Sequence, residues 1–350
     1  MPEFKSDSPV MVTGANGYVA SWLVKGLLEA GNTVHATVRD PDNSDKVGHL
    51  TALANQTKGQ LVLFKADLLD SDAYDAPMSG CELVFHTASP FVIRGVKNNE
   101  KDLLEPARLG TKNVLDAVNR TESVKRVVLT SSVAAIYGDS ADLADSGKTA
   151  FDESDWNHSS SSHHQAYSYS KTIAEKLAWE INDAQDRWTL VAINPGLVLG
   201  PSLGKTRSES MRIFRDMFNG SLFPAAPDLT FGLVDVRDVA KAHLLAAFKP
   251  NASGRHVTVA GTMSYVEIAR VLRERFGVKA ILTPRFTAPK ALIWLMSPLV
   301  GIDRSFVSKN VGYKPAFDNR YIRQDLGLEF SNLNDCVADH FQQIIESRNK

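Results

Sequence analysis

Apolar residues between positions 9 and 196 come in short runs that are separated by longer segments with helical spacing. Most of these runs are rich in Val and Leu. The runs are PVMVTG (9–14), TVHATVR (33–39), QLVLFKADL (60–68), CELVFHTAS (81–89), VKRVVLTSS (124–132) and WTLVAINPG (188–196). Strands that are apolar on both faces are typical of a parallel sheet covered by helices on both sides. The pattern therefore predicts an α/β fold with a doubly wound parallel sheet.

The pattern changes after Pro195, where a loop-rich stretch follows. A helix-and-strand pattern resumes at 231–262, and the remainder of the chain is mainly helical. A chain of 350 residues is long enough for two domains. We predict that residues 1–195 and 231–262 form the sheet domain, and that residues 196–230 and 263–350 form a smaller, mostly helical domain.

Composition places the chain among ordinary globular proteins, with 43% hydrophobic and 23% charged residues. The net charge of −1 gives no electrostatic reason to expect nucleic acid or an anionic membrane surface. Two distant cysteines, Cys81 and Cys336, are typical of reduced intracellular thiols. The N-terminus lacks the features of a signal peptide, and APKALIWLMSPLVGI is too short and too interrupted to span a bilayer. We therefore expect a cytoplasmic protein.

The segment TGANGYVAS places Gly14 and Gly17 between a predicted strand and a predicted helix, with Tyr18 and Val19 opening the helix. A pyrophosphate can approach the backbone N–H groups of such a turn only where no Cβ blocks it. A plain strand-to-helix turn is the alternative explanation. The position of TGANGYVAS at the start of a βαβ unit favours a dinucleotide site over this alternative.

The end of the next strand carries charged residues that bear on the choice of cofactor. A site for NAD usually has an acidic residue there that accepts a hydrogen bond from the ribose 2′-OH, whereas a site for NADP has a cation that binds the 2′-phosphate. Arg39 lies at the expected place, Lys46 follows, and Asp40 is adjacent. We favour NADPH, and a solvated charged loop is the alternative.

Two tyrosines precede Lys171 in the segment HHQAYSYSKTIAEKLAWE. Residues four apart share a helix face and residues two apart do not, so Tyr167 is expected to stand over Lys171 while Tyr169 points away. An ammonium beside a phenol favours the phenolate, which would move the pKa of Tyr167 toward a value useful in proton transfer. A tyrosine four residues before a lysine is common by chance. This pair supports a catalytic role because it follows a dinucleotide turn and the segment VVLTSS.

Taken together, these motifs resemble the extended short-chain dehydrogenase/reductase superfamily, whose fold is a Rossmann-type sheet with a smaller substrate domain. TGANGYVAS resembles its TGxxGxxG/A turn, LTSS its serine strand, and NPGLVLGP the segment that closes over the nicotinamide. VDVRDVAKAH resembles the return to the cofactor domain. Within the superfamily, KADLLD, FHTASP and YSKTIAEKLAW are similar to plant dihydroflavonol 4-reductases, cinnamoyl-CoA reductases and their microbial carbonyl-reductase relatives.

The resemblance implies a role for each matching residue. Ser132 would hydrogen-bond the substrate carbonyl, Tyr167 would give the proton, and Lys171 would hold the nicotinamide ribose and tune Tyr167. Arg39 and Lys46 would hold the 2′-phosphate of NADP(H). The remaining expected cofactor contacts are Gly14, Gly17, Tyr18, Val19, Asp67, Leu68, Thr87, Ala88, Pro195 and Val198.

The expected substrate is a hydrophobic or aromatic aldehyde or ketone. Plant flavonoid reductases carry an Asn five residues after the serine, where this chain has Tyr137, so a generic carbonyl substrate fits better. We expect the pocket to be lined by SPFVI (89–93), by Tyr137 and by GSLFPAAPDLTF (220–231). Ordinary core packing is the alternative for the aromatic residues among these, which include Phe91, Phe223 and Phe231.

Other functions stay open at this point. A sugar-nucleotide epimerase or dehydratase and a hydroxysteroid-type dehydrogenase would use NAD, and a redox sensor or scaffold would bind NADP without turnover. Metal is not expected: His158, His163 and His164 are read as a solvated loop, and His86 as a packed histidine. Apart from the small-molecule substrate we predict no nucleic-acid or membrane partner, and a monomer or homodimer.

Overall fold

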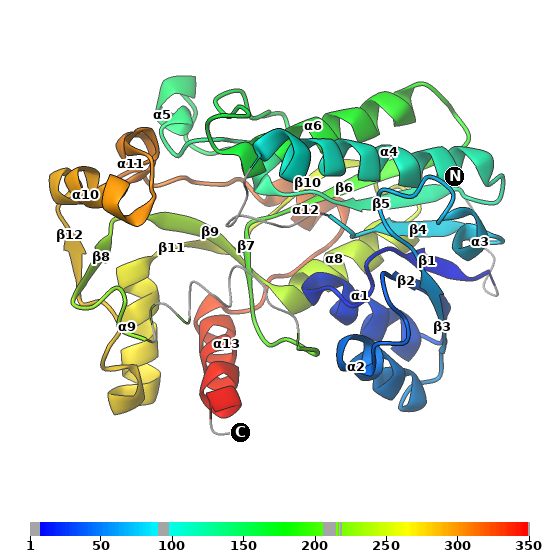
Figure 1. The fold of residues 1–350 in the computed structure, drawn as a ribbon, viewed down its shortest axis with the longest axis horizontal. Helices are drawn as coiled ribbons and strands as arrows, with labels where there is room; N and C mark the ends of the chain where they lie inside the picture. The colour runs from blue at the N-terminus through cyan, green and yellow to red at the C-terminus, as the bar shows by residue number, and fades with distance from the viewer. Residues whose placement is uncertain (1–7, 90–97, 206–214, 216, 218, 349–350) are drawn as a thin grey trace.

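The computed structural model describes residues 8–89, 98–205, 215, 217 and 219–348. Its centre is a seven-stranded parallel sheet with the strand order β10-β6-β5-β4-β1-β2-β3 (Figure 1). The strands are β1 Val10–Val12, β2 Thr33–Val38, β3 Gln60–Lys65, β4 Leu83–His86, β5 Arg126–Thr130, β6 Thr189–Pro195 and β10 Gly254–Thr258. Each of the six predicted apolar runs contains one of these strands, so the predicted doubly wound sheet is confirmed.

Helices cover both faces of this sheet, as the predicted fold requires (Figure 1). On one face lie α4 (Glu105–Arg120) and α6 (Ala166–Asp183), which pack against one another; on the other lie α1 (Tyr18–Glu29), α2 (Ser44–Asn55) and α8 (Val236–Phe248). Separate apolar clusters fill the two sides. Lys46, for which a solvated charged loop was the alternative, lies in the helix α2 (Ser44–Asn55).

A smaller part of the structure lies beyond the carboxyl ends of the central strands. A three-stranded sheet joins β7 (Leu197–Leu199), β9 (Thr230–Asp235) and β11 (Gly261–Ser264), and a two-stranded sheet joins β8 (Ala225–Pro227) and β12 (Phe286–Ala288). Its helices are α9 Tyr265–Phe276, α10 Lys290–Met296, α11 Arg304–Asn310 and α13 Leu333–Arg348. The division of the chain into two domains stays a prediction. The range 231–262, predicted as part of the sheet domain, contains most of β9, and β9 pairs with β7 and β11 in the small sheet.

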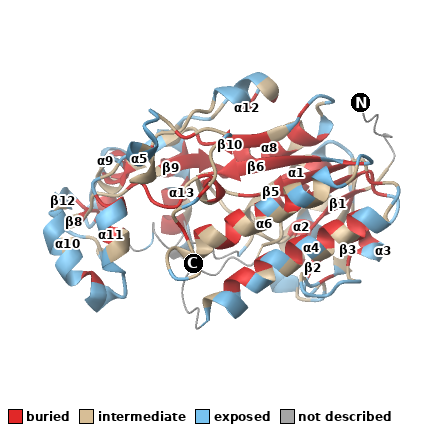
Figure 2. Ribbon diagram, turned by 90° about the horizontal axis from the view of Figure 1, so that it is seen from above, coloured by how far each residue is buried: buried red, intermediate tan, exposed pale blue. Residues whose placement is uncertain are grey.

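Several short elements complete the described chain. They are α3 Asp75–Met78, α5 Asp142–Ser146, α12 Arg320–Asp325, the π-helical turn η1 Glu100–Leu104, and the 3₁₀ turns η2 Val133–Ala135, η3 Gly277–Ala280 and η4 Ser297–Val300. Burial is concentrated in the central strands, whereas α10 and its surroundings are largely exposed (Figure 2). Both cysteines are buried free thiols. Among the described residues, no helix combines the length and apolar character needed to cross a bilayer.

Candidate active site

The turn between β1 and α1 depends on glycine at two positions. Gly14 has a φ of +60°, and a Cβ placed on it would lie 3.0 Å from the Cβ of Ala88. Gly17 is the N-cap of α1 and supplies no side chain to cap its N–H groups. The turn is therefore a bare backbone surface at the N-terminus of a 12-residue helix. The structure brings both glycines and Ala88 together, and their contact with a cofactor stays a prediction.

Thr13 joins the end of β1 to the end of β4 beside this turn. Its Oγ1 accepts hydrogen bonds from the backbone N–H of Thr87 at 3.0 Å and of Ala88 at 2.9 Å. The Nδ1 of buried His86 lies 3.0 Å from the same oxygen. Burial, aided by the charge of Lys171, lowers the pKa of His86 to about 3, so the ring is neutral. His86 is thus a packed histidine, as predicted.

The other predicted cofactor contacts from the first strands fall into two groups. Arg39, Lys46 and Asp67 are exposed at the carboxyl ends of β2 and β3 and in the first turn of α2. Leu68 is half-buried, and its carbonyl accepts a hydrogen bond of 2.8 Å from Asn113 on α4. All four lie on the edge of the sheet that the turn faces, where an adenosine end would lie in such a fold.

Tyr18 holds the turn to the smaller part of the structure. Its phenol donates a 2.6 Å hydrogen bond to the carbonyl of Gly200, after β7. Burial raises the pKa of this phenol well above its ordinary value. Val19 and Val198 are half-buried and pack against the apolar cluster around α1. The side chain of Tyr18 is therefore engaged in structure, and any contact to a cofactor would fall to its backbone.

Ser132 and Tyr167 meet at the carboxyl ends of β5 and β6. Ser132 is the N-cap of η2, where its Oγ accepts from the N–H of Ala134 at 3.1 Å, and it also lies 3.4 Å from the carbonyl of Pro195. Burial raises the pKa of Tyr167, and a hydrogen bond with the Ser132 side chain opposes that rise. The net shift of this pKa is upward, opposite to the direction expected from the neighbouring lysine, because burial dominates. Tyr167 therefore keeps its proton at neutral pH.

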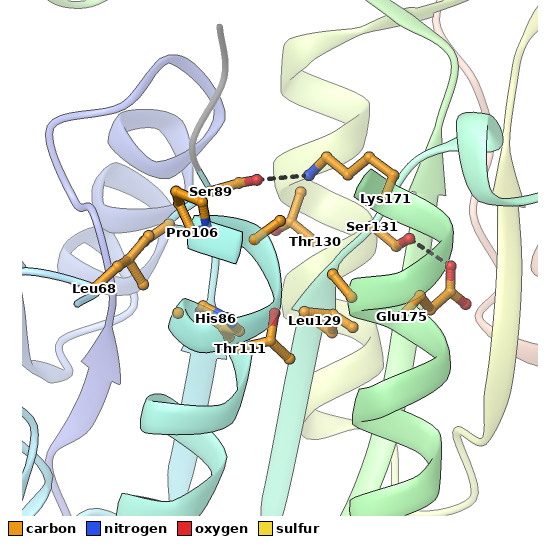
Figure 3. Close-up of a pocket in the computed structure, with 14 residues that line it drawn as sticks. Leu68, His86, Ser89, Pro106, Thr111, Leu129, Thr130, Ser131, Lys171 and Glu175 are labelled. Carbon is orange, nitrogen blue, oxygen red and sulfur yellow. Dashed lines mark hydrogen bonds between the residues drawn. The ribbon is translucent and has the colours of Figure 1, made fainter. Parts of the chain in front are cut away.

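Lys171 points toward the end of β4, one helical turn after Tyr167 (Figure 3). Its Nζ donates a 3.1 Å hydrogen bond to the Oγ of Ser89. Burial lowers the pKa of this ammonium to about 8, although the charge of Glu175 partly opposes the shift. The ammonium thus lies at the end of β4, beside the residues that follow this strand. Tyr169 is half-buried on the same helix, and its role as a packing or rim residue stays a prediction.

A small cavity of about 20 Å³ lies beneath Lys171, between the sheet, α4 and α6 (Figure 3). Its walls include His86, Thr111, Ser131 and Glu175. That volume holds roughly one water molecule, so this cavity is no substrate pocket. It borders a polar network that the sequence reasoning missed.

The centre of this network is Glu175, one turn beyond Lys171 and 1% exposed. Its carboxylate accepts from Ser131, from Asn194 at 2.8 Å and from the Nε of Arg255 at 2.6 Å. Asn194 also donates to the carbonyl of Ser132 at 3.2 Å. The network therefore joins the Lys171 helix to β5, β6 and β10. Because Glu175 lies four residues after Lys171, the spacing argument used for Tyr167 could have found it.

A second buried carboxylate, Asp139, lies before Tyr167. It accepts hydrogen bonds of 2.7 Å each from His164, Gln165 and Asn310, the last from α11. Gln165 has a φ of +53°, which is unusual for a residue with a side chain. His164 is thus engaged in this network, whereas the predicted solvated loop describes the exposed His158 and His163.

The aromatic residues expected in the pocket have different surroundings. Tyr137 stacks on Phe151 at 4.8 Å between ring centroids and meets Phe317 edge-on at 5.5 Å. Phe231 packs edge-on against Tyr265 in the core of the smaller part, and Phe223 is 44% exposed. Phe91, with the rest of 90–93, lies outside the described residues. Core packing is therefore the better description of Phe231.

Three comparisons with known proteins bear on this geometry. A model described as the NAD dependent epimerase/dehydratase family matches residues 10–260. Cinnamoyl-CoA reductase CAD2 of Medicago truncatula is 44% identical over 270 residues, 76% of this chain and 80% of that protein. Cinnamoyl-CoA reductase 1 of Petunia hybrida is 37% identical over 345 residues, 97% of this chain and 93% of that protein. The structure of yeast methylglyoxal/isovaleraldehyde reductase Gre2 complexed with NADPH is similar, with a TM-score of 0.79 and 30% identity, covering 97% and 99% of the two chains.

Proposed function

The chain belongs to the NAD dependent epimerase/dehydratase family, within the extended short-chain dehydrogenases/reductases, and from this premise we propose that it reduces hydrophobic or aromatic aldehydes and ketones to alcohols with NADPH. That the protein is an NAD(P)-dependent reductase follows from its relatives. The carbonyl substrate class and the preference for NADPH are the proposal. The observation that carries it is the meeting of Ser132 and Tyr167 one turn from Lys171.

The described residues fit a dinucleotide cofactor. The bare turn at Gly14 and Gly17 offers N–H groups at a helix N-terminus, and a side chain at Gly14 would collide with Ala88. When bound, the reduced cofactor supplies the hydride that a carbonyl carbon accepts. Arg39 and Lys46, both exposed at the strand edge, would hold a 2′-phosphate.

The protein's own residues polarise the substrate and deliver a proton. Ser132 and Tyr167 would donate hydrogen bonds to the carbonyl oxygen, which stabilises the negative charge that grows there. Because its pKa is raised, Tyr167 carries a proton at neutral pH and can give it to the alkoxide. The ammonium of Lys171 would stabilise the phenolate that remains until a proton is regained.

The test compares two conservative variants on a panel of carbonyl compounds, with NADPH and NADH side by side. Tyr167→Phe removes the proton donor and is expected to lower kcat by about 10²–10⁴-fold. Tyr169→Phe, two residues along the same helix, is the matched control and should change kcat by no more than a few-fold. Melting temperatures of both variants check that they fold. Full activity of Tyr167→Phe would contradict the mechanism.

The choice of cofactor and substrate has its own tests. Arg39→Ala is expected to weaken the use of NADPH by the loss of about 1.5–3 kcal/mol of charge-assisted contact, and to leave NADH almost unaffected. Aromatic and long-chain aldehydes should have a higher kcat/KM than short polar ones. A wild type that prefers NADH, or that turns over UDP-sugars in preference to aldehydes, would favour the epimerase or dehydratase alternative instead. Whether the protein is a monomer or a homodimer stays a prediction.

A further inference from the structure

Residues 286–302 form an apolar projection at one end of the molecule, which we call the α10–η4 knob (Figure 2). The helix α10 contains no buried residue, although its sequence is KALIWLM. Eight large apolar side chains of the knob are 38–83% exposed. They are Phe286, Leu292, Trp294, Leu295, Met296, Leu299, Val300 and Ile302.

This concentration differs from the rest of the described surface. A smaller group, Val278, Ile281 and Leu282, lies at η3, and other exposed large apolar side chains such as Val62 and Leu69 are scattered. Scattered apolar side chains are normal on a protein surface, whereas a contiguous group marks a place of interaction. The knob therefore needs a partner that covers its apolar side chains.

The charge around the knob indicates the chemistry of that partner. Between residues 285 and 314 there are five cations and a single acid, Asp303, in a chain whose net charge is −1. The cations are Arg285, Lys290, Arg304, Lys309 and Lys314. Lys309 is paired with Asp139, but the guanidinium of Arg304 lies 4.2 Å over the ring of Trp294. The ammonium of Lys290 lies 4.7 Å over the ring of Tyr313. Lys290 and Arg304 thus place two cations over aromatic rings beside the apolar tip.

We propose that the α10–η4 knob docks the protein on a membrane surface that contains anionic lipid. Exposed Leu, Met and Val side chains at the tip enter the acyl boundary, while Trp294 and the cations lie at the level of the headgroups. The segment is too short to span a bilayer, so it lies on the surface. A second copy is a poorer occupant, because a two-fold contact through this face would bring its cations against one another. The net charge of the whole chain gave no reason to expect a membrane, because it averages out the excess of cations between residues 285 and 314.

The experiment is co-sedimentation of the full chain with vesicles of phosphatidylcholine, with and without about 30% phosphatidylserine. The variant Leu295→Gln with Leu299→Gln removes apolar contact without changing charge, and we expect binding at least tenfold weaker. The matched control, Val62→Gln with Leu69→Gln, changes two exposed apolar residues far from the knob in sequence and should bind like the wild type. Lys290→Gln and Arg304→Gln should each weaken binding about fivefold.

Two results would overturn the proposal. One is equal binding of the wild type and the Leu295→Gln, Leu299→Gln variant to the anionic vesicles, or no binding of either. The other is a wild-type dimer, seen by light scattering, that the knob variant converts to a monomer while the wild type leaves the vesicles unbound. Melting temperatures of all variants check folding, which these exposed positions should leave unchanged. None of this depends on the proposed substrate.

Discussion

Two buried carboxylates flank the Tyr167 and Lys171 pair, and they differ in what they hold. Glu175 joins the second half of α6 to three strands of the central sheet through Ser131, Asn194 and Arg255. Asp139 joins the beginning of α6 to α11 in the smaller part through His164, Gln165 and Asn310. One carboxylate thus fixes the catalytic helix to its own sheet, and the other fixes it to the rest of the molecule.

The two carboxylates also differ in how their charge is compensated. Arg255 is a buried permanent cation that stacks 3.8 Å from the Trp156 ring and donates at 2.6 Å to Glu175. Burial alone would raise the pKa of Asp139, but hydrogen bonds from Asn310, His164 and Gln165 outweigh it and lower that pKa. Lys309 also lies 3.4 Å from Asp139, but its side chain is 47% exposed, so water can solvate it. Breaking the first network strands a buried cation, whereas breaking the second does not. We therefore expect the first to govern stability and the second to govern the geometry at Tyr167.

The largest effect is expected from Glu175→Gln. Removing one partner of a buried ion pair leaves Arg255 uncompensated, which costs about 3–5 kcal/mol of unfolding free energy. Chemical denaturation of the purified variant measures this loss. Adding Arg255→Met to the same chain removes the stranded charge, and the double variant should recover part of the stability. A Glu175→Gln variant as stable as the wild type would contradict the role given to this network.

The second effect concerns Lys171, whose charge is next to Glu175. Its pKa is about 8 in the folded chain and close to 10.4 in an unfolded one. Between these values the unfolded chain binds more protons, so the free energy of unfolding rises with pH, by up to roughly 3 kcal/mol in total. The measurement is denaturation of the wild type and Lys171→Met from about pH 7 to 11. The variant should lack this rise, and an equal rise in both would refute the assignment.

The third effect is expected from Asp139→Asn, which keeps the size of the side chain. Loss of hydrogen bonds to a charged acceptor costs about 1.5–3 kcal/mol, less than the loss of Glu175. Because the pKa of Asp139 is lowered, its contribution is present at neutral pH and is lost as pH falls through the folded-state pKa. We also expect a lower kcat, since a neutral amide accepts the Gln165 hydrogen bond more weakly than a carboxylate, and this bond holds the unusual backbone of Gln165. Asp145→Asn, exposed on α5, is the matched control. A kcat equal to that of the control would remove Asp139 from the positioning of Tyr167.

The smallest effect calibrates the others and comes from the surface. Lys112 and Asp116 on α4 form an exposed pair at 2.5 Å, four residues apart. Asp116→Asn should change the free energy of unfolding by about 0.3–0.5 kcal/mol, because exposed pairs are well screened. Denaturation under the same conditions as Glu175→Gln makes the comparison direct. A loss as large as that of Glu175→Gln would mean that burial does not explain the difference.

The sequence predicted the sheet and the core of the site because both rest on local patterns. Short apolar runs identify strands, glycines between a strand and a helix identify the turn, and a spacing of four identifies Tyr167 and Lys171. These signals lie within a few residues of one another. They were sufficient for the fold class and for the residues now grouped at the strand ends.

The polar networks could not be predicted in the same way. Arg255 is separated from Glu175 by 80 residues, and Ser89 from Lys171 by 82. Such pairs meet only because the strand order places β10 beside β6 and β4 beside β5. The upward shift of the Tyr167 pKa was not predicted either, because it comes from burial by segments that are distant in sequence.

The place of β10 in the chain also has a consequence for synthesis. Pro195 ends β6 and Gly254 begins β10, its neighbour at the edge of the central sheet. At roughly 5–20 residues per second, a ribosome takes several seconds to make the intervening chain. During that time β6 is an unpaired edge strand of the nascent sheet, and Glu175 has no ion pair with Arg255. A truncated messenger that ends in this interval would therefore encode a chain with an exposed edge strand, which is prone to aggregate. That chain would nevertheless contain Ser132, Tyr167 and Lys171.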